Sequence, residues 1–237
     1  MNKYAIISDK VPVICDRIKK YGYKLIYTEC MDEFISYEQY HADMQCLMLG
    51  DKLIVLKECK ELQNQLKEAD INYITTRSNC SGKYPENIKL NSLFLSDKLI
   101  GKSNSIDSEI IKFCKKNSIK TIDVKQGYTA CSCTKINEKA IITTDESIFR
   151  ELEKTDIDVL KISQEGIKLH GAKRGECGFI GGASCLIDEN KVLFFGDITT
   201  HKDYDKIKAF CDKHNVMINY IKNMPLIDIG GCILLKN

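Results

Sequence analysis

The sequence predicts an α/β fold of five similar units arranged as a β/α propeller, each unit running strand, strand, helix, strand. Two observations predict this fold. The order apolar run, polar turn, apolar run, helix, short strand occurs four times between residues 46 and 221. Residues 225–236 and 3–27 together supply a fifth copy of that order. Because neighbouring units pair to bury their faces, pairing of the N- and C-terminal strands would close the ring and leave no free sheet edge.

The first four units follow one another along the chain. A hairpin is predicted at 46–56, then a helix with Leu62, Leu66 and Ala69 on one face, then a strand at 71–74. In the second unit the hairpin, helix and last strand are predicted at 92–100, 110–114 and 120–124. In the third unit they are predicted at 133–144, 146–154 and 158–162, and in the fourth at 185–195, 207–211 and 217–221. The fifth unit combines Cys232 with a strand at 4–7, a helix through 14–18 and a strand at 23–27. No linker interrupts the pattern, so one domain over residues 1–237 is predicted.

A position between a predicted strand and a predicted helix is occupied in the five units by Asp9, Glu58, Asn104, Asp145 and Asp197, and the sequence after Asp9 and Asp145 is typical of a helix start. A carboxylate at this position typically accepts the free N–H groups of the first helical turn. Both residues are therefore predicted to be helix N-caps.

Composition excludes several classes of partner. The 35 Lys+Arg and 33 Asp+Glu residues nearly balance, so no basic surface for nucleic acid is predicted. Every apolar run is far shorter than the ~18 residues of a membrane span, and the start of the sequence lacks a signal-peptide pattern. We therefore expect a cytoplasmic protein without a membrane partner. The oligomeric state stays open.

Cysteine is frequent, with 12 residues in 237, but a chain of this length has a hydrophobic core and needs no disulfide framework. Reduced thiols are predicted. The glycines match neither a P-loop nor a dinucleotide fingerprint, so no nucleotide cofactor is expected. No Cys-x-x-Cys pair or Cys/His ligand spacing indicates a metal, and a soft-metal site of converging thiolates is the alternative to that expectation.

One strand position carries a thiol or hydroxyl in every unit. In four units this position lies six residues before a lysine of the predicted hairpin turn, and in the fifth it lies at the matching place. It is occupied by Cys46, Ser92, Cys133, Cys185 and Cys232, and the four lysines are Lys52, Lys98, Lys139 and Lys191. Strands that converge on a propeller axis leave room only for small side chains. These residues are therefore either packing or part of a functional site.

The unit order and three short stretches resemble a known superfamily. Five strand-strand-helix-strand units joined through the termini are similar to the penteins, or guanidino-group-modifying enzymes. That superfamily includes arginine deiminases, dimethylarginine dimethylaminohydrolases and amidinotransferases, together with a non-catalytic branch that binds ribosomal subunits. Residues 124–128, 178–183 and 225–230 resemble an uncharacterised bacterial family of the same fold.

The resemblance implies a catalytic role for Cys232, because catalytic penteins carry a nucleophilic cysteine in the first strand of the last unit. A thiolate there would attack an amidine or guanidinium carbon. Two stretches depart from the catalytic pattern. Residues 178–180, Gly-Phe-Ile, stand where that branch has a histidine, and they cannot transfer a proton. Lys125 stands in the stretch where that branch carries carboxylates, and its charge would repel a guanidinium ion.

Other residues are candidates for the missing roles. His170, in the loop 165–175, or His41, just before the first unit, would act as general base; an ordinary surface or turn histidine is the alternative for each. The predicted substrate-binding residues are Asp43, Lys125, Gln126 and Asp228. Two functions follow: a Cys232-dependent hydrolase or transferase of a small amidine- or amide-like molecule, or a non-catalytic pentein that binds a small ligand or a protein surface.

Overall fold

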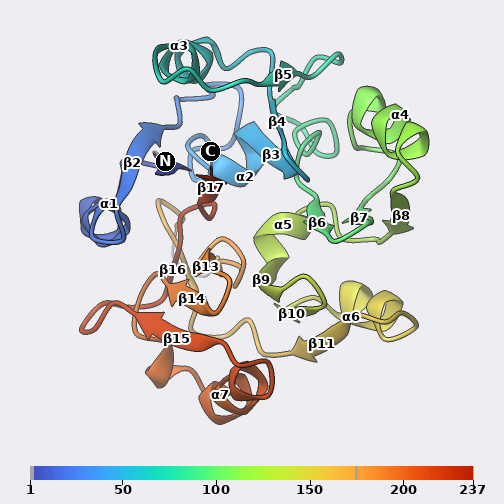
Figure 1. The fold of residues 1–237 in the computed structure, drawn as a ribbon. Helices are drawn as coiled ribbons and strands as arrows, with labels where there is room; N and C mark the ends of the chain where they lie inside the picture. Colours follow the sequence, from blue (N-terminus) through green and yellow to red (C-terminus); the bar gives the residue numbers. More distant parts are fainter. Residues whose placement is uncertain (1–2, 174–175, 237) are drawn as a thin grey trace.

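The computed structural model describes residues 3–173 and 176–236, whose strands form five three-stranded sheets and one two-stranded sheet. In every three-stranded sheet the central strand pairs antiparallel with one neighbour and parallel with the other. These sheets surround a common centre, with the longer helices on the outside (Figure 1). The fold is therefore a mixed α/β arrangement of small sheets, and none of the described sheets closes on itself.

The elements follow the predicted order. The first unit holds α2 (Ala42–Gln45), β3 (Cys46–Leu49), β4 (Lys52–Val55), α3 (Lys60–Glu68) and β5 (Ile74–Thr75). The second holds β6 (Leu93–Leu95), β7 (Lys98–Gly101), α4 (Ser108–Lys116) and β8 (Lys120–Asp123). The third holds α5 (Thr129–Ser132), β9 (Cys133–Asn137), β10 (Ala140–Thr143), α6 (Glu146–Leu152) and β11 (Asp158–Lys161). The fourth holds β12 (Lys168–Leu169), β13 (Ser184–Asp188), β14 (Lys191–Phe194), the 3-10 helix η1 (Ile198–Thr200), α7 (Tyr204–Lys213) and β15 (Met217–Tyr220).

The terminal strands pair with each other directly. The last strand, β17 (Ile233–Lys236), runs antiparallel to β1 (Lys3–Ile7), and the register joins Ile6 to Ile233. On its other side β1 pairs parallel with β2 (Tyr23–Tyr27), after the helix α1 (Pro12–Lys19). The N- and C-terminal strands therefore build one sheet, in which β1 lies between β17 and β2 (Figure 1).

The helices cover the sheets through one apolar face. In α3 the buried positions include Leu62 and Leu66, and in α7 they include Ile207 and Phe210. The central strands, such as residues 53–55 of β4, are buried on both faces because helices cover one side and other strands the other. None of the described helices is long and apolar enough to cross a membrane.

Two local expectations differ from the structure. The strand predicted at 71–74 begins only at Ile74, because Asp70 adopts a left-handed conformation and the N–H of Ile71 donates to Leu66 at the end of α3. Asp145 caps α6, accepting a 2.9 Å hydrogen bond from the N–H of Ile148. The corresponding prediction for Asp9 is wrong, since α1 begins after Val11 with a proline in its first turn and no side-chain cap.

Candidate functional site

The first strands of the units enclose a cavity of about 560 Å³, which we call the axial cavity. Residues of β3, β6, β9, β13 and β17 all line it, with Asp43, Gly181 and Gly231 near the starts of those strands. Acidic residues gather where the hairpins turn, among them Asp51 and Glu138. A cavity of this size suits a small molecule, and its acidic lining favours a cation over an anion.

Cys232 lines the axial cavity and is half-buried. The Cys185 thiol beside it, together with burial, raises the pKa of the Cys232 thiol well above its ordinary value. This shift favours the neutral thiol of Cys232 over an activated thiolate.

His41 and Asp43 form a buried pair at the start of α2, each about 5% exposed. Nδ1 of His41 lies 3.9 Å from Oδ1 of Asp43, and the N–H of Asp43 donates to the carbonyl of Gly230. Nε2 of His41 and both carboxylate oxygens of Asp43 lack a hydrogen bond of normal geometry among the described residues, although the neighbouring Cys131 thiol partly offsets the rise in the pKa of Asp43 that burial causes. Buried polar atoms are rarely left this way, so the pair has unused capacity to bind a ligand.

Burial determines the protonation of this pair. It raises the pKa of Asp43 well above its ordinary value, and the nearby carboxylate of Asp228 adds to the shift. Burial also lowers the pKa of His41 to about 3. These shifts favour the protonated acid of Asp43 and the neutral imidazole of His41. A bound cation would favour the Asp43 carboxylate.

Asp228, in β16 (Ile227–Asp228), is fully buried but has partners for both carboxylate oxygens. They accept hydrogen bonds from the N–H groups of Phe179 and Gly230, each at 2.8 Å. Its carbonyl accepts the N–H of His170 at 2.9 Å, where β16 pairs with β12. Asp228 therefore ties the two segments beside the cavity together, and its carboxylate is already occupied.

Asp228 makes the stability depend on pH. Burial raises its pKa from 3.8 to about 6, so the neutral acid contributes stability below pH ~4 that is lost as the pH rises through ~6. Between pH 4 and 7 the loss amounts to about 2 kcal/mol. We expect urea unfolding to show a smaller loss in Asp228→Asn than in the wild-type protein, because the raised pKa of Asp43 contributes a loss of the same sign to both. A carbon NMR titration of the Asp228 carboxyl should give a midpoint near 6. Equal pH dependence of the two proteins would contradict the assignment.

The other predicted residues lie in different surroundings. His170 is half-buried, and burial and then the charge of Lys10 lower its pKa, so its imidazole is neutral near pH 7. The side-chain amide of Gln126 donates to the helix-capping carboxylate of Asp145 at 2.9 Å. Lys125 is exposed. Of the predicted site residues, Cys232 and Asp43 line the axial cavity, and the lining does not include His41, His170, Asp228, Lys125 or Gln126.

Several buried polar residues beside the cavity escaped sequence reasoning. Asn91 donates its amide N–H to Sγ of Cys131 at 3.1 Å and to the carbonyl of Asp43 at 3.2 Å. Asn87 donates to Glu38 Oε2 at 3.0 Å and to the Tyr128 hydroxyl at 2.9 Å. They lie in segments between the repeated elements, where no periodic pattern marks them. Only the pair of cysteines at 131 and 133 gave a signal.

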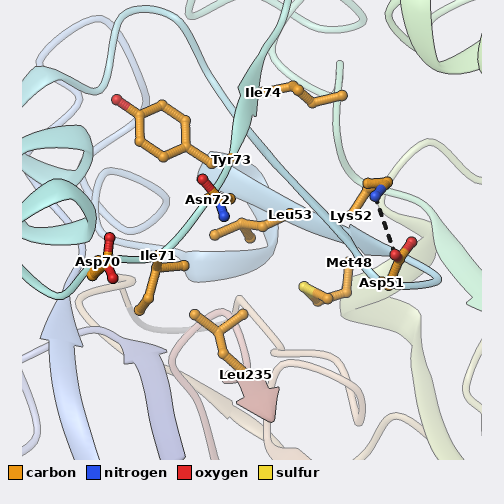
Figure 2. A pocket seen from close by; sticks show the side chains of 10 residues that line it. All are labelled: Met48, Asp51, Lys52, Leu53, Asp70, Ile71, Asn72, Tyr73, Ile74 and Leu235. Carbon is orange, nitrogen blue, oxygen red and sulfur yellow. Dashed lines mark hydrogen bonds and ion pairs between the residues drawn. The ribbon is translucent and has the colours of Figure 1, made fainter. Parts of the chain in front are cut away.

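A second cavity of about 570 Å³ lies on the flank of the first unit (Figure 2). Its lining combines aliphatic side chains such as Leu53, Ile71 and Leu235 with polar ones, among them Asp70 and the pair of Lys52 with Asp51 at 3.1 Å. None of the predicted catalytic or substrate-binding residues lines it. The axial cavity, which is lined by Cys232 and Asp43, is therefore the better candidate site.

Comparison with known proteins places the chain in a family. The model of a family described as "Family of unknown function (DUF6873)" matches residues 6–233. The chain belongs to this family. No curated protein matches the sequence of this DUF6873 member.

Solved structures of three kinds of enzyme resemble the DUF6873 chain. A dimethylarginine dimethylaminohydrolase adduct with S-methyl-L-thiocitrulline has a TM-score of 0.59 at 8% identity, covering 94% of this chain and 93% of that one. An agmatine deiminase from C. jejuni has a TM-score of 0.59 at 13% identity, covering 100% and 94%. The inosamine-phosphate amidinotransferase of Streptomyces griseus has a TM-score of 0.57 at 12% identity, covering 93% and 76%.

These enzymes all have the pentein fold, so the DUF6873 chain shares the fold that its sequence resembles. At such low identity the likeness concerns the fold alone. The departures at residues 125 and 178–180 remain, and Gly178 has a structural reason. A Cβ at position 178 would lie 2.5 Å from Cβ of Asp228 and 2.7 Å from the carbonyl oxygen of Lys168. A histidine therefore cannot replace Gly178 in this packing.

Proposed function

We propose that the chain binds a small amidinium- or guanidinium-like cation in the axial cavity and acts on it as a hydrolase or transferase with Cys232 as nucleophile. The observation that carries the proposal is the carboxylate of Asp43. It is buried, has no hydrogen-bond partner among the described residues, and lines the same cavity as Cys232. An amidinium ion would supply the N–H donors and the positive charge that these oxygens lack.

In the proposed reaction, Cys232 loses its proton and its sulfur adds to the amidine carbon. The C=N π electrons move to nitrogen, and the leaving amine departs with the C–N electron pair after taking up a proton. Water, or an acceptor amine, then displaces the sulfur and regenerates the thiol. A cation bound beside Cys232 lowers the pKa of its thiol, which offsets the effect of burial. His170 and His41 are the two candidate bases; neither lines the axial cavity, and His41 is the more deeply buried of the two.

A binding module without catalysis is the second candidate, and the neutral state of Cys232 favours it. The Cys185 thiol and burial both oppose thiolate formation, and no histidine stands at 178–180. In that case Asp43 would still bind a cationic group, with Cys232 as packing. The ligand would be a small molecule, or a cationic side chain on the surface of another protein.

Alkylation of the native protein tests the catalytic proposal. We expect chloroacetamidine, which carries an amidinium ion beside its reactive carbon, to label Cys232 at least tenfold faster than the neutral chloroacetamide. Mass spectrometry quantifies each cysteine, and the exposed Cys30 and Cys177 are internal controls without this preference. Asp43→Asn should abolish the preference at Cys232. If Cys232 reacts only after denaturation, the nucleophile is excluded and the binding module remains.

We further propose that the five units form one closed propeller domain, with a small-molecule ligand and a cytoplasmic location. The direct pairing of β17 with β1 supports closure of the ring. So does the approach of first strands from neighbouring units, such as β3 to β6 and β9 to β13. Limited proteolysis tests the domain proposal, since one resistant fragment of nearly full length is expected.

A further inference from the structure

We propose that His41, Asp43 and Cys131 form a binding site for one Zn²⁺ ion at the inner end of the axial cavity. This goes beyond the proposed function, which requires no metal. The three residues come from α2 and its N-cap in the first unit and from α5 in the third. The two short helices therefore bring together residues that lie about ninety positions apart in the sequence.

The three side chains already converge. One ligand atom from each residue can be chosen so that all lie within 4.8 Å of one another. A tetrahedral zinc ion with bonds of about 2.0–2.3 Å holds its ligand atoms roughly 3.3–3.8 Å apart. Side-chain rotations that close the group by about 1 Å would therefore complete the site.

The potential ligand atoms are unused. Nε2 of His41 and both carboxylate oxygens of Asp43 are buried and have no hydrogen-bond partner among the described residues. Leaving such atoms unsatisfied costs free energy, and a coordinated cation would satisfy both residues at once. Both side chains are at least nine-tenths buried, so these atoms do not merely await bulk water.

A second layer of contacts suits a metal-bound thiolate. The amide N–H of Asn91 points at Sγ of Cys131 and also at the carbonyl of Asp43, while Oδ1 of Asn91 accepts the N–H of Ala130 at 2.9 Å. Asn91 is 1% exposed, so its orientation is fixed by these contacts. An N–H group that donates to sulfur stabilises negative charge on it, and contacts of this kind orient metal ligands.

The donor set indicates the metal. One imidazole nitrogen, one carboxylate oxygen and one thiolate sulfur suit Zn²⁺ better than Mg²⁺ or Ca²⁺, which prefer oxygen ligands. Three protein ligands leave the fourth position of a tetrahedral site open. Asp43 and Ala130 line the axial cavity, so water or a small ligand in the cavity could reach the open position.

The alternative thiol site in the cavity is the pair Cys185 and Cys232, and the test must separate the two. Chelator-treated full-length protein is titrated with Co²⁺, and then with Zn²⁺ in competition. We expect one equivalent of Co²⁺ to produce the near-ultraviolet absorption of a cobalt–thiolate bond. Cys131→Ser and His41→Gln should each weaken binding at least tenfold. The buried Cys133→Ser and the cavity-lining Cys232→Ser are matched controls that should bind like the wild type.

Three results would each overturn the site. The first is that the wild-type protein binds less than one equivalent of Co²⁺, and the second is that Cys131→Ser and His41→Gln bind Co²⁺ as tightly as the wild type. The third is that Cys232→Ser loses Co²⁺ binding. Should the His41 or Cys131 variant fail to fold, cadmium NMR of the wild-type protein decides instead. A shift typical of one sulfur with nitrogen and oxygen ligands supports the site, and one typical of two sulfurs contradicts it. The metal site and the proposed amidinium site both use Asp43. Cys131→Ser should weaken metal binding but leave chloroacetamidine labelling of Cys232 intact, so failure of the metal proposal can be distinguished from failure of the proposed function.

Discussion

Gly182→Ala is expected to remove most of the stability of the protein, lowering the free energy of unfolding by more than about 4 kcal/mol. A Cβ at this position would lie 1.8 Å from Oδ1 and 2.4 Å from Cγ of Asp228. Asp228 cannot move aside, because the N–H groups of Phe179 and Gly230 hold its carboxylate. Gly182 itself is held by hydrogen bonds to Cys131, Ile229 and Gly231.

Urea unfolding of Gly182→Ala beside Gly166→Ala measures this effect. Gly166 has a φ of +89°, and no neighbouring atom lies within 4 Å of the place that an added Cβ would take, so its substitution tests backbone strain without a clash. That strain costs only about 1–2 kcal/mol. Equal stability of the two variants would show that Asp228 is free to move, and the rigid placement of the cavity segments would then be wrong.

Asp43→Ala is expected to stabilise the ligand-free protein by about 1–3 kcal/mol while removing its affinity for cations. The wild-type carboxyl is buried without a hydrogen-bond partner among the described residues, and the substitution removes that cost. Because Asp43 lines the axial cavity, the space it vacates joins that cavity instead of forming a closed void. A residue that lowers the stability of the folded protein and lies at a cavity wall is typical of a functional site.

Asp228→Ala is the matched control, because it removes a second buried carboxyl from the same region. It should destabilise the protein, since the N–H groups of Phe179 and Gly230 would lose their acceptors. Thermal unfolding at pH 6 and pH 8 compares the two variants. If Asp43→Ala destabilises as strongly as Asp228→Ala, Asp43 is a structural residue and the proposed cation site loses its basis.

Sequence periodicity predicts most of the sheet elements because each has its own hydrophobic pattern. The hairpins and helices lie where apolar spacing places them, and the pairing of β1 with β17 follows from two complementary apolar strands. Register is harder. A shift between Leu186 and Asp188 places Ser184 opposite Phe194 and Cys185 opposite Leu193, and a count along the sequence cannot detect such a bulge.

The candidate site depends on contacts that no local pattern encodes. His41 and Asp43 were singled out because they precede the first strand, but Cys131 joins them only through tertiary packing of two units. Gln126 is predicted from the resemblance to bind substrate, whereas its amide contacts the capping carboxylate of Asp145. Side-chain partners across units are set by the whole fold, so residue type and spacing indicate the candidates without fixing their contacts.

Isothermal titration calorimetry with benzamidine and its neutral analogue benzamide tests the central claim most directly. Because burial raises the pKa of Asp43 and a bound cation would lower it, binding of the amidinium ion should release up to one proton. The heat should therefore differ between two buffers of different ionisation enthalpy. We predict binding of benzamidine to the wild type, with proton release, and no measurable binding of benzamide or of benzamidine to Asp43→Asn. Equal binding of the charged and neutral ligands, or unchanged binding to Asp43→Asn, would contradict the proposed cation site.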